Sequence, residues 1–207
     1  MTRYSLFYSV RSPFARRVRV ALGKLNIPFE AREISVFEPP AELKEANPLG
    51  QVPVLVAHDP KDPFAIPDSS TILEFLHENY GNRIWPPDLA ARARVRAAAT
   101  LAEGVMTFTV SRFLETTRKV PSVEFELEYE EGIAATLENI AAQPLLQMPW
   151  KVSDLQLTQA GYDLMIALDY LDVRAPHIPW RSRWPALQKF HEKHRSRSDL
   201  LPTVPPA

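Results

Sequence analysis

The stretch NPLGQVPVLV, residues 47–56, leads from a proline-containing loop into a short apolar strand. Pro53 stands at the mouth of that strand and has no N–H, so one edge of the strand begins unpaired. A cis bond between Val52 and Pro53 would turn the backbone of Val52 outward, where it could pair with a peptide-like ligand. Because only about 5% of such bonds are cis, the pattern alone argues against that form.

Prolines divide the chain into two parts. The 207 residues include 20 prolines, about twice the number that average usage of roughly 5% would give. Eleven of them lie within residues 13–87, and the next after Pro87 is Pro121. Because proline ends or prevents helices, this contrast predicts short elements first and long helices afterwards. We therefore expect one domain over residues 1–82 and a second over residues 88–207.

The expected elements of the first part form a βαβαββα series. Apolar patterns and helix-start signals place them in turn at residues 3–8, 13–25, 29–34, 40–46, 54–56, 65–66 and 68–80. That order predicts an α/β domain with a small mixed sheet and helical cover.

The second part is predicted to be all-α. Apolar residues recur at helical spacing over residues 88–117, 123–142, 158–172 and 185–194. The first of these helices has two apolar faces, one of which could be a subunit contact. The tail at residues 201–207 is expected to be ordered only if it docks.

Composition and charge exclude several function classes. The 24 basic and 25 acidic residues leave a formal net charge of −1, so no global basic field attracts nucleic acid or an anionic membrane. The absence of cysteine excludes disulfides, thiolate metal sites and cysteine nucleophiles. His191 and His194 lack a third ligand, so we expect a solvated face there and no metal. With no signal segment and no apolar run near about 18 residues, we expect a soluble cytoplasmic protein.

Ser12 precedes Pro13, which stands where a helix would begin. At such a position the serine hydroxyl lies where unpaired N–H groups and the positive end of the helix dipole converge. An anion placed there would be stabilised, and a thiolate is one such anion. A plain helix cap explains Ser12 equally well, and spacing alone favours the cap.

Asp68 and Ser69 crowd the start of another predicted helix. Helix capping is a sufficient explanation for both. The functional alternative is a clamp for a zwitterion, in which backbone N–H groups and Ser69 hold a ligand carboxylate while Asp68 binds its ammonium group.

Together these segments resemble the cytosolic glutathione transferase family in its serine-dependent classes. The resemblance rests on SPF at residues 12–14 followed by RVR at 17–19, on residues 47–55, and on the pair Asp68 and Ser69, in the family's order and spacing. It covers about residues 1–82, and the second part matches more loosely. It implies a thioredoxin-like domain joined to an all-helical domain, in a homodimer.

The resemblance also implies roles for individual residues. Ser12 would be the catalytic hydroxyl that donates a hydrogen bond to the glutathione sulfur. Val52, before a cis Pro53, would pair with the cysteinyl main chain, and Asp68 with Ser69 would hold the γ-glutamyl end. Gln51 and Pro53 would also belong to the glutathione-binding residues. Tyr8 is the alternative thiol activator, because other classes use a tyrosine at the end of the first strand.

The activity so implied is a detoxifying transferase that joins glutathione, its co-substrate, to a small hydrophobic electrophile without a metal. We expect the electrophile between the domains, against Phe14, Val105, Met106, Phe108 and Arg112. Two alternatives stay open: a non-catalytic binding or assembly module, and a glutathione-dependent isomerase or lyase on the same site.

One departure concerns the helix that follows Thr158. Gly161 stands where the family has the acidic residue of a Ser/Thr-x-x-Asp capping box, and glycine has no side chain to close the box. The start of that helix is therefore unexplained by the sequence.

Overall fold

The computed structural model describes residues 3–81, 83–145, 147–153 and 156–205. The chain forms two compact units, one of residues 1–84 with 198–207 and one of residues 85–197. The first boundary lies close to the expected one. The second differs from expectation, because the last ten residues belong to the first unit.

The first unit contains a four-stranded sheet in the order β2-β1-β3-β4. Its strands are β1 (Tyr4–Tyr8), β2 (Glu30–Glu33), β3 (Val54–Ala57) and β4 (Phe64–Pro67). The pair β1 and β2 is parallel, whereas β3 is antiparallel to both β1 and β4. Together with three helices this confirms the predicted βαβαββα series, and the domain has the thioredoxin-like fold.

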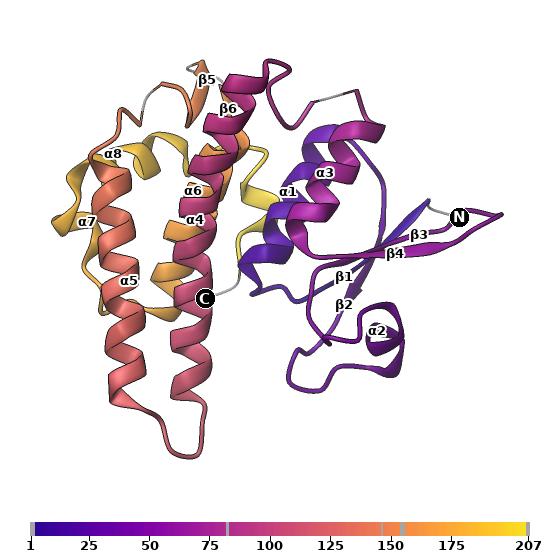
Figure 1. Ribbon diagram of the computed structural model, residues 1–207, viewed down its shortest axis with the longest axis horizontal. Helices are drawn as coiled ribbons and strands as arrows, with labels where there is room; N and C mark the ends of the chain where they lie inside the picture. The colour runs from indigo at the N-terminus through magenta and orange to yellow at the C-terminus, as the bar shows by residue number, and fades with distance from the viewer. Residues whose placement is uncertain (1–2, 82, 146, 154–155, 206–207) are drawn as a thin grey trace. The chain divides into compact units, whose positions relative to one another are not determined.

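Helices cover both faces of this sheet (Figure 1). On one face, α1 (Pro13–Leu25) and α3 (Ser69–Asn79) contact each other. On the other, Leu43 of the short α2 (Ala41–Ala46) packs into a cluster with Phe7 and Val54. Because side chains alternate along a strand, the neighbours Leu6 and Leu55 point to the opposite face, and both are fully buried.

The C-terminal segment of the chain docks on α1. It forms a short 3₁₀ helix, η1 (Leu201–Thr203), which contacts α1. The Nε of Arg16 donates a hydrogen bond to Thr203 Oγ1 at 3.1 Å, and both residues are buried. The described part of the tail, residues 201–205, therefore docks, as expected for an ordered tail; residues 206–207 lie outside the described residues.

The second unit is helical, as predicted. It comprises α4 (Leu89–Thr116), α5 (Val123–Ala141), α6 (Gln159–Arg174), α7 (Trp180–Arg183) and α8 (Pro185–His194). The long α4 begins at the expected cap, Asp88, whose Oδ1 accepts from the N–H of Ala91 at 2.8 Å. It contacts both α5 and α6, in agreement with its two apolar faces. No helix of the described part of the chain is both long and apolar enough to span a bilayer.

Two features of this unit were not predicted. One is the four-residue helix α7, and the other is a two-stranded hairpin of β5 (Lys151–Ser153) and β6 (Gln156–Leu157) between α5 and α6. The hairpin leads directly into Thr158, the cap of α6.

The hairpin explains how α6 begins without a capping box. Thr158 Oγ1 accepts from the N–H of Gly161 at 3.2 Å, which is the first half of the box. The other half would be an acidic side chain that accepts the N–H of Thr158. Here the carbonyl of Trp150 accepts that N–H at 3.1 Å. A Cβ on residue 161 would lie 2.2 Å from this carbonyl oxygen, so only glycine fits.

Candidate functional site

Strand register gathers three of the predicted site segments at one end of the sheet. Phe7 of β1 pairs with Val54 of β3, and Val54 also pairs with Pro67 of β4. From this row the chain leaves β1 toward Ser12, arrives in β3 from Val52, and leaves β4 into Asp68. The three segments lie far apart in the sequence, and the antiparallel pairings bring them to the same end of the sheet.

Ser12 caps α1 and keeps a proton to donate. Its Oγ accepts from the N–H of Ala15 at 3.2 Å, so the capping interpretation is realised. This bond uses a lone pair of the oxygen and not the hydroxyl proton. Within the described residues the Ser12 hydroxyl has no acceptor, and the side chain is half-buried. One serine can thus cap the helix and donate to a ligand atom.

Tyr8, the alternative activator, is differently occupied. Its hydroxyl donates to Glu33 Oε2 over a long 3.4 Å. The guanidinium of Arg19 lies 4.9 Å from the centre of its ring. The phenol is therefore directed to residues of β2 and α1, whereas the Ser12 hydroxyl has no such acceptor in the part of the chain that the structure describes.

The loop before β3 is held by Asn47. This buried side chain donates to the carbonyl of Gln51 at 2.9 Å and accepts from the N–H of Leu49 at 3.2 Å. The Val52–Pro53 bond is cis, as the resemblance implied and the pattern alone did not. Within the described residues, the N–H and C=O of Val52 make no hydrogen bond. That backbone is available to an extended ligand.

Asp68 holds the start of α3. Its Oδ1 accepts from the N–H groups of Ser70 and Thr71 at 2.8 and 3.1 Å, so the capping interpretation holds here as well. The residue has a φ of +73°, a conformation that costs a non-glycine residue about 1–3 kcal/mol. Asp68 is exposed, and its second oxygen, Oδ2, accepts nothing from the described residues. A ligand ammonium group could bind there.

Ser69 is buried, and its partner is one that sequence reasoning missed. Nη1 of Arg17, a residue only 1% exposed, donates to Ser69 Oγ at 2.9 Å. The signal was present in the sequence, because Arg17 falls within the apolar stripe of α1.

The five residues predicted to contact an electrophile lie in both units. Phe14 is a half-buried residue of α1 in the first unit, and the other four belong to α4 in the second. Val105 and Met106 are fully buried. Such burial is also expected of ordinary core residues of α4, so it does not distinguish a pocket from the core. The ring of Phe108 packs against Gly132 of α5. A shared pocket of these residues stays a prediction.

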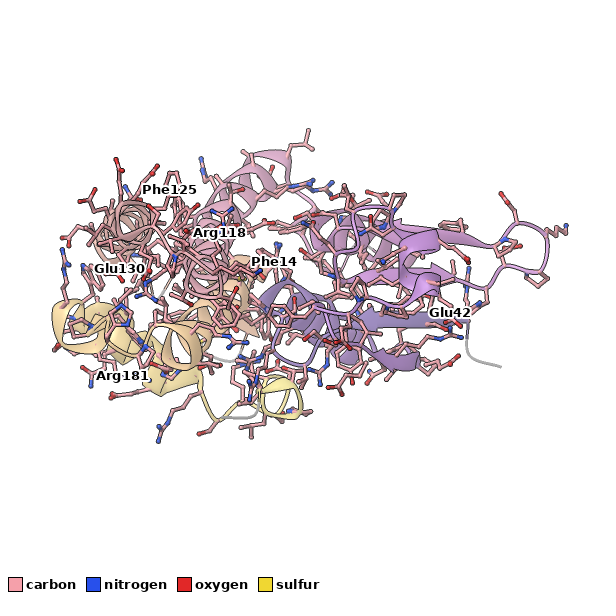
Figure 2. The ribbon with its side chains drawn as sticks, turned by 90° about the horizontal axis from the view of Figure 1, so that it is seen from below. Phe14, Glu42, Arg118, Phe125, Glu130 and Arg181 are labelled. Carbon is pink, nitrogen blue, oxygen red and sulfur yellow. The ribbon has the colours of Figure 1, made fainter. Side chains whose placement is uncertain are left out.

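Arg112 belongs to a charge cluster on α4 and α5. Its Nη2 lies 3.4 Å from Glu126 Oε2, and its Nε donates to Glu130. Glu130, labelled in Figure 2, also lies 2.8 Å from Nε2 of His177. Burial opposes the charge on Glu130, but the hydrogen bonds from His177 and Arg112 outweigh it and hold the pKa of Glu130 below its usual range.

The prediction of a solvated face at His191 and His194 is wrong, because both are buried. His191 Nε2 lies 2.6 Å from Asp169 Oδ1, and Asp172 completes a group of possible metal ligands. However, Asp172 already accepts two hydrogen bonds from Arg181, at 2.6 and 2.7 Å. The cation at this cluster is a guanidinium, so the contacts are those of a structural ion pair.

Comparisons with known proteins agree with this geometry. The chain is 29% identical over 201 residues, 96% of each protein, to the uncharacterized GST-like protein YibF of Escherichia coli. A glutathione S-transferase of Methylobacterium radiotolerans, solved with glutathione sulfonate, superimposes with a TM-score of 0.87 at 28% identity, over 100% of this chain and 96% of the other. A glutathione transferase family member of Pseudomonas fluorescens with bound glutathione gives 0.86 at 28% identity, over 99% and 100%.

The first unit carries the family's signature. Residues 6–84 match the glutathione S-transferase N-terminal domain. They span the sheet of the first unit except for the first two residues of β1, and they include the helix starts at Ser12 and Asp68. The full chain is also similar to glutathione transferases solved with glutathione or glutathione sulfonate, so the conclusion is that residues 6–84 match the glutathione S-transferase family and that the whole chain resembles its members.

Proposed function

We propose that the chain is a glutathione transferase that conjugates the glutathione thiolate to small hydrophobic electrophiles, with Ser12 as the catalytic hydroxyl. The observation that carries the proposal is the state of Ser12 at the start of α1. Its oxygen is fixed by the N–H of Ala15 while its proton has no acceptor among the described residues. A sulfur anion beside it would receive a hydrogen bond and lie at the positive end of the α1 dipole.

The chemical effect required of this site is modest. A free thiol has a pKa of about 8.5, so most of it is protonated at neutral pH. A site that lowers this pKa by one or two units raises the thiolate fraction about ten- to a hundredfold, which corresponds to roughly 1.4 to 2.7 kcal/mol. One hydrogen bond to a charged atom is worth about 1.5 to 3 kcal/mol. The thiolate then forms a C–S bond and expels a halide, or adds to an activated alkene.

The remaining contacts to glutathione would be made by residues at the same end of the sheet. Val52, whose backbone groups bind nothing in the described chain, would pair with the cysteinyl main chain, next to Gln51 and Pro53. The γ-glutamyl group would bind with its ammonium at Asp68 and its carboxylate at Ser69. The neighbouring structures with glutathione or glutathione sulfonate support this assignment.

For the second substrate we propose that Phe14, Val105, Met106, Phe108 and Arg112 contact the electrophile. We further propose that the protein is cytoplasmic and homodimeric and that it uses no metal. Since the chain has no cysteine, it should lack the thiol–disulfide exchange of cysteine-bearing relatives.

The deciding experiment compares Ser12→Ala with Tyr8→Phe, two variants that each remove one hydroxyl. Titration calorimetry gives the affinity for glutathione, and turnover of a chlorinated dinitrobenzene gives the rate. We expect Ser12→Ala to lower turnover about ten- to a hundredfold with little change in glutathione affinity, and Tyr8→Phe to leave both near wild type. The opposite pattern would assign the role to Tyr8. Glutathione binding without any turnover would leave a binding module.

A further inference from the structure

Arg17 connects the two helix starts of the candidate site. It lies on α1, one turn beyond Ser12, and its Nη1 reaches Ser69 Oγ on α3 at 2.9 Å and Ser70 Oγ at 3.4 Å. Arg17 and Ser69 are each only 1% exposed. A permanent positive charge is therefore buried directly behind the first turn of α3.

This contact decides what the Ser69 hydroxyl can do. A guanidinium has only donors, so Ser69 Oγ must be the acceptor in the pair. The hydroxyl proton is thereby directed to some other acceptor, and within the described residues Ser69 Oγ has none. An oxygen that accepts from a cation also becomes a stronger donor through polarisation. Ser69 is thus prepared to donate to an anion.

Other groups at the same place also favour negative charge. Asp68 Oδ1 already binds the N–H groups of Ser70 and Thr71. The N–H of Ser69 has no partner among the described residues, so it stays available beside the hydroxyl. The positive end of the α3 dipole coincides with both donors. Because Ser69 is buried, a carboxylate bound there loses water, and its hydrogen bonds with these donors are stronger than they would be in water.

We propose that Arg17 is a positioning residue for the γ-glutamyl carboxylate of glutathione. It holds Ser69 as a hydrogen-bond donor to that carboxylate and thereby increases the affinity for the carboxylate form of the ligand. This inference rests on the proposed function, since it assumes that the chain binds glutathione.

The test uses two ligands that differ only in this carboxylate. Calorimetry compares glutathione with its decarboxylated analogue, γ-aminobutyryl-cysteinyl-glycine, on the full chain. We expect Arg17→Met to raise the Kd for glutathione about ten- to a hundredfold, the range for a hydrogen bond to a charged group. The Kd for the analogue should change by less than about threefold, because the variant keeps the packing of the side-chain stem.

Two further variants separate positioning from core packing. Arg17→Lys keeps a charged donor and should retain most of the preference for glutathione over the analogue. In a double-mutant cycle, Arg17→Met should cost far less in a Ser69→Ala background than in wild type, because the two residues act through one hydrogen bond. A merely structural arginine would weaken both ligands equally and would show additive effects.

Several outcomes overturn the inference. One is an Arg17→Met variant that keeps the preference of wild type for glutathione, and another is additivity in the cycle. If Arg17→Met does not fold, Ser69→Ala and Arg17→Lys decide with the same ligand pair, and an unchanged preference in Ser69→Ala refutes the inference. Wild-type protein that binds both ligands equally refutes this inference alone, whereas wild-type protein that binds neither refutes the proposed function.

Discussion

Replacement of Gly161 by alanine tests how α6 begins. A Cβ at this position would lie 2.2 Å from the carbonyl oxygen of Trp150 and 3.1 Å from a Leu157 methyl group. The carbonyl would have to retreat by about 1 Å to reach an ordinary contact distance. Its 3.1 Å hydrogen bond from the N–H of Thr158 would then be broken. The start of α6 would lose the substitute for its capping box.

The expected free-energy change follows from three contributions. A buried donor left without a partner costs about 1–3 kcal/mol, and overpacking of a tight contact costs a further 1–3 kcal/mol or so. Alanine in a helix gains up to about 1 kcal/mol over glycine, which offsets part of this. We therefore expect Gly161→Ala to lower the free energy of unfolding by about 3 kcal/mol.

The assay is urea denaturation followed by tryptophan fluorescence. All four tryptophans, at positions 85, 150, 180 and 184, lie in the second unit, so the signal reports the unit that contains α6. A lower midpoint with an unchanged slope would show lost stability. Gly104→Ala is the matched control, because nothing lies within 4 Å of the added Cβ in the middle of α4. This control should gain about 0.5–1 kcal/mol.

The sharpest form of the test is Gly161→Asp. That substitution supplies the acidic residue of the family's capping box, and sequence comparison alone would expect it to stabilise the protein. The carbonyl of Trp150 occupies the required space, so we expect destabilisation at least as large as for alanine. A Gly161→Asp or Gly161→Ala protein as stable as wild type would refute this reasoning.

Three further predictions concern stability and are measured by urea denaturation. Asp88→Ala removes the cap of α4 and should cost about 1 kcal/mol, whereas Asp88→Asn should stay near wild type. Thr203→Val removes the Thr203 Oγ1 acceptor of the buried Arg16 Nε and should cost about 1–3 kcal/mol; because all four tryptophans lie in the second unit, this variant is followed by circular dichroism, and an unchanged midpoint would show that this hydrogen bond contributes nothing. The lowered pKa of Glu130 implies that its contribution to stability is present above the unfolded carboxyl pKa of 4.5 and lost as the pH falls below it. Glu130→Gln should flatten that part of the pH profile.

The parts of the fold that local chemistry determines could be predicted from the sequence. Helix starts at Ser12, Asp68 and Asp88 were identified because a cap acts within three residues of itself. The sheet of the first unit was identified from short apolar runs between prolines. The candidate site followed because its three segments lie at the ends of these elements.

The parts that depend on contacts between distant residues could not be predicted. One partner of Arg17 is Ser69, 52 positions away, and although Arg17 lies within the apolar stripe of α1, no local pattern identifies that partner. His191 and His194 were expected in solvent because no third ligand was apparent in the sequence, yet both are buried. Pattern alone favoured a trans bond before Pro53, and only the resemblance to a family indicated the cis form that the structure contains.

The docked tail has a practical consequence for cutting this protein into parts. Because residues 198–207 belong to the first unit, a fragment that stops at residue 84 would lack Thr203, which accepts a hydrogen bond from Arg16, and would uncover the surface of α1 that η1 contacts. Such a fragment would lack part of the first unit, although it would contain all of residues 6–84, which match the family. A self-sufficient version requires the final ten residues to be rejoined to residue 84 through a flexible linker.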